Sequence, residues 1–248
     1  MRSKLGKTPG VDQLPNEVFK NDLIINVLNK LFQLCLDSGK IPSIWRKALI
    51  SPIPKDEKAD RRIPLNYRGI SLLCCSAKLY TSMLNCRLEQ FFNEEQLLVD
   101  EQNGFRKDLS CQDHIYVLDS IIRNRMNEDL PTFTAFVDLQ KAFDCVDRDF
   151  LMHKLLLAGI NGKMYFAIKN IYTMTLACVK LNSNMKSSWF HTLFGVRQGD
   201  SMSPSLFSVF LNDLAKEIQE MNCGVQVNGR NVGILLYADD IALMSTTE

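Results

Sequence analysis

The stretch Gly233-Ile-Leu-Leu-Tyr-Ala-Asp-Asp-Ile-Ala-Leu-Met244 sets two adjacent aspartates, Asp239 and Asp240, inside an otherwise apolar segment. Two neighbouring carboxylates repel each other, and each is costly to remove from water without a partner. At the tip of a hairpin both side chains can turn toward one site, where a divalent cation would offset the repulsion. A solvent-exposed Asp-Asp turn between two buried strands explains this segment equally well, so the choice between a metal site and a plain turn depends on other parts of the chain.

The composition is that of a folded protein with a basic N-terminal part. Hydrophobic residues make up 46% of the 248 residues, which is enough to bury a substantial core. The net charge is only +1, but residues 1–72 carry 13 Lys and Arg against 7 Asp and Glu. Clustered cations suit a polyanionic partner such as a nucleic acid, although an ordinary solvated surface gives the same count.

The eight cysteines lack the spacing of a zinc site, and we expect them to be small buried residues in a reducing compartment. The N-terminus lacks the apolar core of a signal peptide, and the sequence contains no apolar run of about 18 residues. These patterns predict a nuclear or cytoplasmic protein, without a signal peptide and without a membrane partner.

Hydrophobic periodicity predicts a mainly helical first part and a mixed second part, with a boundary near Pro131. The expected helices cover residues 23–37, 76–93, 110–127, 149–158, 163–174 and 203–221. The expected strands cover residues 48–53, 132–138, 176–181, 189–194, 225–227 and 232–236. Asn228-Gly229 is a strong hairpin signal, and a second hairpin must then carry Asp239 and Asp240 at its turn.

The sequence predicts further details for two of these elements. The helix at 110–127 should open with a capping box formed by Ser110 and Asp113, and its inner face should include Ile115, Leu118 and Ile122. The strand at 132–138 is rich in aromatic and β-branched residues, and this pattern predicts a buried strand.

That strand ends in Asp138, as the later strand ends near Asp239, about a hundred residues further along the chain. Mg²⁺ prefers a few carboxylates together with waters and substrate phosphates. Two such ions about 4 Å apart can activate an attacking hydroxyl and stabilise a leaving pyrophosphate. This chemistry needs carboxylates on rigid elements, and strand ends are rigid.

Five blocks of sequence together resemble the reverse transcriptase of non-LTR (LINE-type) retrotransposons. They occur in the order of that family and span nearly the whole chain. The blocks are KTPGVDQLPNEVFK (7–20), WRKALISPIPK (45–55) with NYRGISLL (66–73), GFRKDLSCQDHI (104–115), AFVDLQKAFDCVDR (135–148), and GVRQGDSMSPSLFSVFLNDL (195–214) leading to YADDIALM (237–244).

The resemblance implies an α/β (α+β) fold, the right-hand polymerase with fingers in residues 1–130 and a palm in residues 131–248. The palm would be an antiparallel sheet backed by helices, and a thumb would be absent. The implied activity is RNA-directed DNA synthesis from a primer 3′-hydroxyl. The implied partners are an RNA template, a DNA primer and dNTPs.

The resemblance also implies a catalytic metal site. Asp138, Asp239 and Asp240 would be catalytic and would bind two Mg²⁺ ions, for which Mn²⁺ can substitute. Asp239 would bridge both ions, Asp240 would support the catalytic one, and the Leu139 carbonyl would help to ligate.

Further roles follow from the same resemblance. Lys55 and Arg68 would clamp the triphosphate, Phe143 would exclude a 2′-hydroxyl, and Gln198 and Gly199 would lie beside the incoming nucleotide. For Phe143 core packing is the alternative, and for Lys55 a place on the charged surface.

For three more cationic residues the sequence leaves alternatives open. Arg106 and Lys107 would contact the template, but Asp108 and Leu109 stand where relatives usually have small or basic residues, and an acidic residue weakens binding to a backbone of phosphates. Arg197 would reach a phosphate or, equally well, would be a surface charge.

Rival functions remain open at this point. Since the sequence stops soon after the aspartate pair, we expect a weakly active fragment whose partners include the missing thumb and endonuclease regions of a parent polyprotein. A catalytically inactive nucleic-acid-binding remnant is one alternative, and a viral RNA polymerase or a group II intron-like maturase is another. Ala238, where viral RNA polymerases usually carry glycine, and the ring of Phe143 favour DNA synthesis by a retroelement.

Overall fold

The computed structural model describes residues 6–58, 60–181, 185–227 and 229–247. The chain divides into two compact units, each formed by two separate segments. Unit 1 consists of residues 1–87 and 143–203, and unit 2 of residues 88–142 and 204–248. Because these units interleave along the chain, the expected division into fingers and palm at residue 130 stays a prediction about subdomains.

Unit 1 contains a mixed sheet of four strands in the order β2-β1-β4-β5. The strands are β1 (Lys47–Pro54), β2 (Tyr67–Leu72), β4 (Leu176–Val179) and β5 (Phe190–His191). Strand β1 pairs antiparallel with β2 and parallel with β4. The pairing with β4 covers only Lys47–Ile50, so Pro52 and Pro54, which lack an N–H group, lie beyond it.

The helices of unit 1 are α1 (Asp22–Ser38), α2 (Cys75–Glu94, which continues into unit 2), α4 (Arg148–Leu157), α5 (Gly162–Tyr172), and the short 3₁₀ helices η1 (Asn16–Lys20), η2 (Ser43–Arg46) and η3 (Pro64–Asn66). An aromatic cluster joins α1, η2 and α2. The rings of Phe32, Trp45 and Tyr80 lie within 6.0 Å of one another between centroids. The indole Nε1 of Trp45 donates a hydrogen bond to Ser76 Oγ (3.0 Å), which satisfies its only polar group.

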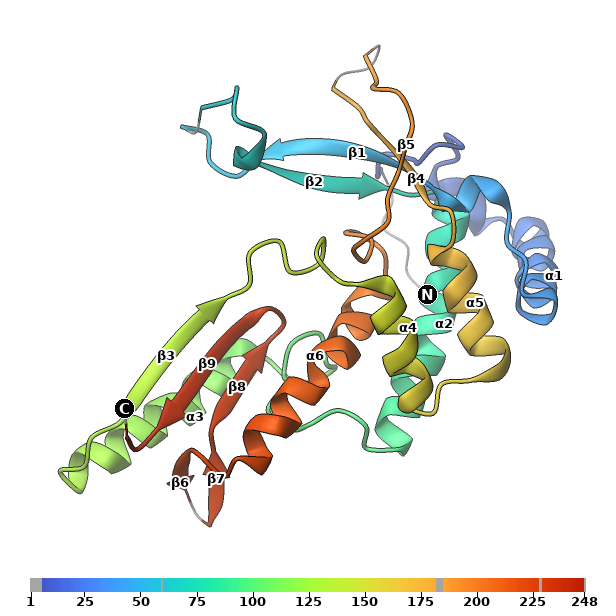
Figure 1. Cartoon of the computed structure of the whole chain (residues 1–248). Coiled ribbons are helices and arrows are strands. Elements are labelled where there is room, and N and C mark those ends of the chain that lie inside the picture. The colour runs from blue at the N-terminus through green and yellow to red at the C-terminus, as the bar shows by residue number, and fades with distance from the viewer. Residues whose placement is uncertain (1–5, 59, 182–184, 228, 248) are drawn as a thin grey trace. The chain divides into compact units, whose positions relative to one another are not determined.

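Unit 2 contains the antiparallel sheet β3-β9-β8, and these strands lie side by side in Figure 1. The elements of this unit are α3 (Cys111–Asn127), β3 (Phe133–Asp138), α6 (Ser203–Glu220), the small hairpin β6 (Val225–Val227) and β7 (Arg230–Val232), β8 (Ile234–Tyr237) and β9 (Asp240–Ser245). Strands β8 and β9 are covered on both faces: Leu235 and Met244 pack with Ile121 of α3, whereas Ile234, Leu236 and Ile241 pack with Ala215 of α6. Strand alternation explains this separation, since successive side chains point to opposite faces.

Most of the expected elements are confirmed, with ends that differ by only a few residues. The capping box of α3 is present, because Asp113 Oδ2 accepts hydrogen bonds from the Ser110 backbone N–H (2.7 Å) and hydroxyl (2.9 Å). The strand expected at 232–236 is instead divided at Gly233 between β7 and β8. Asn228, in the expected first turn, lies outside the described residues.

Three expectations about burial are wrong. All six residues of β3 are exposed rather than buried, because the residues of this sheet that pack in the buried clusters belong to β8 and β9. On α3 Ile121 is buried and Leu118 packs against the same cluster as expected, but Ile115 and Ile122 are exposed, so the inner face is rotated from the expected one. Four of the eight cysteines are exposed, and all eight are free thiols. Within the described ranges, no helix has the length and apolar character needed to cross a membrane.

Candidate active site

The second predicted hairpin is confirmed, with the aspartate pair at its tip. Tyr237 and Asp240 pair at the ends of β8 and β9, so Ala238 and Asp239 form a two-residue turn. The φ angle is +61° at Ala238, but not positive at Asp239. A positive φ at the first central position is typical of a type II′ turn, where glycine is the usual residue. Ala238 therefore has a backbone conformation that an L-residue rarely adopts.

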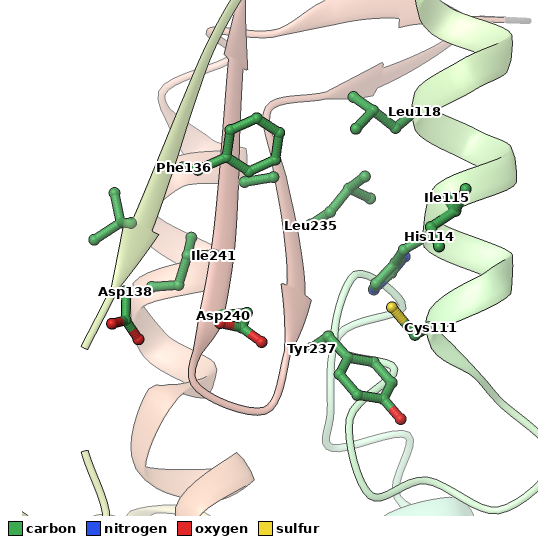
Figure 2. A pocket seen from close by; sticks show the side chains of 12 residues that line it. Cys111, His114, Ile115, Leu118, Phe136, Asp138, Leu235, Tyr237, Asp240 and Ile241 are labelled. Carbon is green, nitrogen blue, oxygen red and sulfur yellow. The ribbon is translucent and has the colours of Figure 1, made fainter. Parts of the chain in front are cut away.

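Asp138 lies directly opposite Asp240 in the antiparallel register of β3 and β9. Directly opposed residues point their side chains to the same face of a sheet. Figure 2 shows the two carboxylates at the same ends of neighbouring strands. Both residues are exposed, so the pair can reach a solvent-borne ligand.

A cleft of about 290 Å³ lies between this face of the sheet and α3, and both carboxylates line it. The remaining walls are mainly apolar and include Phe136, Leu118 and Tyr237, and the imidazole of His114 also lines the cleft (Figure 2). Phe136 is 74% exposed although it is a large aromatic residue. The cleft thus combines two carboxylates with an exposed apolar face.

The residues at this end of the sheet fit a magnesium site in which the protein supplies only some of the ligands. Mg²⁺ is typically held by one or two carboxylates, with waters and substrate phosphates as the other ligands, and Asp138 and Asp240 provide two. Asp239 is half-buried in the turn and does not line the cleft. The Leu139 carbonyl accepts a hydrogen bond from the Ala142 N–H (3.2 Å), which leaves its second lone pair. Among the described residues, no three His, Cys, Asp or Glu side chains are grouped closely enough to hold an ion by themselves.

The predicted nucleotide-binding residues belong to unit 1, where backbone hydrogen bonds join two of the sequence blocks. The Val196 N–H donates to the Phe143 carbonyl (2.8 Å), and the Gly195 N–H donates to the Val146 carbonyl (2.8 Å). Gly195 has a φ of +83°, and a Cβ atom there would lie 2.8 Å from the Asp144 carbonyl oxygen. Only glycine allows so close an approach, so Gly195 fixes the loop against the turn that carries Phe143.

Two further contacts strengthen this junction between the loop of Gly195 and the turn of Phe143, and add β2 to it. Gln198 Nε2 donates a hydrogen bond to Asp144 Oδ1 (3.0 Å). Gly199 has a φ of +94°, and a Cβ atom there would lie 3.3 Å from the carbonyl oxygen of Ser71 in β2. The structure therefore brings together residues from three of the blocks: those around Phe143, Gln198 and Ser71.

Lys55 and Arg68 lie where β1 and β2 are joined by their connecting loop. Arg68 pairs with Ile53, and the Lys55 N–H donates to the Asn66 carbonyl (2.8 Å). Both side chains belong to exposed residues, so they are accessible to an anionic ligand.

Arg197 is neither a phosphate ligand nor a surface charge, and both earlier interpretations of it are wrong. Its guanidinium is buried and donates hydrogen bonds to the carbonyls of Trp45 (2.8 Å) and Ile171 (2.7 Å). Burial lowers the pKa of Arg197, and it raises the pKa of the fully buried Asp200 nearby. The arginine thus connects three segments of unit 1.

Arg148 has a similar role, for which the sequence carries no local signal. Its guanidinium donates to the carbonyls of Gly195 (2.8 Å) and Thr192 (2.7 Å), and to the hydroxyl of Thr175 (2.7 Å). Burial lowers its pKa to about 10. The two arginines therefore hold the backbone of the GVRQGD block in place from the inside of unit 1.

The two predicted template-binding residues of unit 2 differ in their surroundings. Arg106 Nη1 donates to the carbonyls of Val99 (2.9 Å) and Gln102 (3.4 Å), so part of its guanidinium holds the preceding loop. The Lys107 side chain is 91% exposed and lies 4.0 Å from Asp108. A template contact by either residue stays a prediction, and Lys107 is the more accessible of the two.

Solved structures identify the class of fold. The chain is similar to apo telomerase from Candida tropicalis truncated from its C-terminal domain, with a TM-score of 0.60 and 11% identity over 90% of this chain and 49% of that one. Telomerase from Candida albicans in complex with a fragment of telomeric RNA gives a TM-score of 0.56, again with 11% identity, over 94% of this chain and 42% of that one. The expected α+β fold with fingers and palm is confirmed: it is the reverse transcriptase fold.

Residues 53–248 match the family model described as reverse transcriptase (RNA-dependent DNA polymerase), and the chain belongs to that family. It is 30% identical to a probable RNA-directed DNA polymerase from transposon BS of Drosophila melanogaster, over 97% of this chain and 26% of the relative. It is 27% identical to the RNA-directed DNA polymerase from mobile element jockey of the same species, over 98% of this chain and 26% of the relative.

These relatives are RNA-directed DNA polymerases of non-LTR retrotransposons, so the resemblance found in the sequence is confirmed. A third relative is the Pol polyprotein of element R2DM from Drosophila melanogaster, 25% identical over 99% of this chain and 22% of the relative. The chain thus spans about a quarter of the length of the relatives that it matches.

Proposed function

We propose that this chain performs RNA-directed DNA synthesis, adding deoxynucleotides to a primer 3′-hydroxyl at the Asp138 end of the β3-β9-β8 sheet. The observation that carries the proposal is the direct pairing of Asp138 with Asp240 in a chain of the reverse transcriptase family. Two carboxylates on one face of a rigid sheet meet the requirement of nucleotidyl transfer for fixed anionic ligands.

Asp138 and Asp240, with Asp239 from the turn and the Leu139 carbonyl, would hold two Mg²⁺ or Mn²⁺ ions. When bound, such ions supply charge stabilisation for the attacking and the leaving oxygen. The strand pairing holds the carboxylates in position before substrate arrives, which reduces the cost of reorganisation in the transition state. The apolar side chains of the cleft, Phe136 among them, provide an apolar surface beside the two carboxylates.

The residues of unit 1 would bind the incoming nucleotide. The planar guanidinium of Arg68 suits bidentate contact with a phosphate, and Lys55 adds a second cation. The ring of Phe143 would leave no room for a 2′-hydroxyl. Gln198 and Gly199 would lie beside the nucleotide, and the absence of a side chain at Gly199 allows close approach. The roles of Phe143, Gln198 and Gly199 are supported by the junction that joins the turn of Phe143, the loop of Gln198 and β2.

The nucleic-acid partners would be an RNA template paired with a DNA primer. Lys107, with Arg106 beside it, would contact template phosphates, because an exposed ammonium group releases counterions when it binds a polyanion. Such a contact predicts that template affinity falls as the salt concentration rises.

Single-nucleotide incorporation tests this proposal. The chain is mixed with a DNA primer annealed to an RNA template, one complementary dNTP and Mg²⁺, and the extended primer is resolved on a gel. We expect extension that requires Mg²⁺ and that falls at least 1,000-fold in Asp138→Asn, roughly 4 kcal/mol of transition-state stabilisation. Asp56→Asn, which neutralises an exposed loop carboxylate, is the matched control and should extend normally. Absence of Mg²⁺-dependent extension by the unsubstituted chain would overturn the proposal.

A further inference from the structure

A buried side-chain amide holds the turn between β8 and β9. Gln102 is 1% exposed. Its Oε1 accepts hydrogen bonds from the backbone N–H groups of Ala238 (3.2 Å) and Gly104 (2.8 Å), and its Nε2 donates to the Ala238 carbonyl (3.4 Å). A carboxamide offers both donors and acceptors, so one side chain pairs with both polar backbone groups of Ala238, as a neighbouring strand would.

The backbone around Gln102 continues this pairing along β8. The Asn103 N–H donates to the Leu236 carbonyl (3.0 Å), and the Leu236 N–H donates to the Glu101 carbonyl (2.8 Å). A Cβ atom at Gly104 would lie only 2.1 Å from the Ala238 nitrogen, so the segment and the turn are in direct contact. Residues 101–104, which we call the turn clamp, therefore bind β8 and its turn from the side opposite β9.

The turn needs such support because of its sequence. Ala238 has a φ of +61°, in a region that is unfavourable for every residue with a Cβ atom. The usual glycine would adopt this conformation without strain, and its replacement by alanine leaves the turn dependent on contacts from outside the hairpin. Asp239 and Asp240 follow directly, so the directions of both carboxylates depend on the backbone at Ala238.

We propose that Gln102 is a positioning residue of the active site, which fixes the Ala238 peptide and through it the orientation of Asp239 and Asp240. This inference rests on the proposed polymerase function, because it assigns to Gln102 a part in that reaction. Gln102 acts through the turn and not on substrate. Its removal should therefore lower the rate of the chemical step and leave primer–template affinity unchanged.

A second buried carboxamide in unit 2 provides a matched control. Asn212 on α6 is also buried, accepts a hydrogen bond from the Val99 N–H (3.0 Å) and donates to the Leu97 carbonyl (2.9 Å). It bridges backbone groups in the same way as Gln102, but its partners lie outside the hairpin. Gln102→Met and Asn212→Leu each remove a buried amide and keep a side chain of similar size, so both should lower stability.

Two measurements separate positioning from mere structural support. Hydrogen exchange of the peptide that contains Ala238, followed by mass spectrometry, reports on the turn without any catalysis. We expect at least tenfold faster exchange at Ala238 in Gln102→Met and no change there in Asn212→Leu. Single-turnover incorporation should be at least tenfold slower in Gln102→Met than in Asn212→Leu, while the Kd for primer–template should be equal in both.

A rescue variant adds a third test. Adding Ala238→Gly to Gln102→Met should recover most of the lost rate, because glycine adopts the turn conformation without external support. The inference is overturned if the two single variants exchange equally at Ala238, if they incorporate nucleotide at equal rates, or if glycine gives no recovery. If the unsubstituted chain does not extend a primer, the proposed function has failed, and unequal exchange would then still establish the clamp on the turn.

Discussion

Asp138 and Asp240 are paired across β3 and β9 with their carboxylates on one face of the sheet. Like charges that lie directly opposite each other destabilise an antiparallel pair. The chain therefore keeps an arrangement that opposes folding and favours the binding of cations. Stability and cation binding therefore make opposite demands on this pair of carboxylates.

Asp138→Asn should make the metal-free chain more stable, by about 0.2–1 kcal/mol, because it removes the cross-strand repulsion. Added Mg²⁺ should raise the Tm of the unsubstituted chain, since a ligand that binds only the folded state stabilises it, and should have a smaller effect on the variant. Thermal unfolding with EDTA and with Mg²⁺ provides both comparisons. Asp56→Asn controls for the loss of one negative charge, and an equal Mg²⁺ response in all three proteins would contradict a site at Asp138.

Phe143→Ala should weaken the rejection of ribonucleotides. If the ring excludes the 2′-hydroxyl, the ratio of kcat/KM for dNTP over rNTP should fall by roughly ten- to a hundredfold. Steady-state incorporation of matched dNTP and rNTP on the same primed template measures this ratio. Phe166→Ala removes an exposed ring of α5 and should leave it unchanged. Unaltered discrimination in Phe143→Ala would mean that the ring only packs against its neighbours.

Arg197→Met should cost about 2–4 kcal/mol of unfolding free energy. The substitution leaves the buried carbonyls of Trp45 and Ile171 without these donors and removes a cation that interacts with the buried Asp200. Urea unfolding measures the loss, and Arg62→Met, at a largely exposed side chain, should change stability by less than about 1 kcal/mol. A raised KM for dNTP with unchanged stability would instead restore Arg197 as a phosphate ligand.

Asp113→Ala should remove a pH-dependent contribution to stability. Hydrogen bonds from the backbone and hydroxyl of Ser110 lower the pKa of Asp113 in the folded chain. A carboxyl group whose pKa is lower in the folded state stabilises above its unfolded pKa, about 4, and this stabilisation is lost as the pH falls through the folded pKa. The Tm of Asp113→Ala should therefore lie below that of the unsubstituted chain at pH 7, and the difference should shrink below about pH 4. Asp119→Ala, further along α3, is the control and should show a smaller difference at pH 7. A difference that persists unchanged at pH 3 would exclude the capping box as its source.

Local sequence was enough to predict most helices, both hairpins and the candidate metal ligands. Helix α1 ends at Gly39 with a φ of +66°, and α3 begins at the capping box of Ser110, because these signals act within one turn of the chain. The turn at Asp239 was predictable because two adjacent carboxylates are costly to bury, so an apolar segment that contains them favours a hairpin with both near its tip.

Burial was less predictable, because it depends on which neighbours an element meets. The apolar sequence of β3 indicated a buried strand, but the helices pack on β8 and β9, and all residues of β3 are exposed. Arg148 and Arg197 were indistinguishable from other cations in the sequence, since only distant backbone carbonyls make them internal. The same holds for Gln102, whose partner Ala238 lies over a hundred positions away.

The sequence by itself determined the residue types, the strand ends and the turn that an active site of this family requires, since these follow from the order of nearby residues. Only the tertiary structure decided that Asp138 faces Asp240. A shift of one residue in the register of β3 against β9 would turn the first carboxylate to the opposite face, and that register is fixed by packing between segments a hundred residues apart.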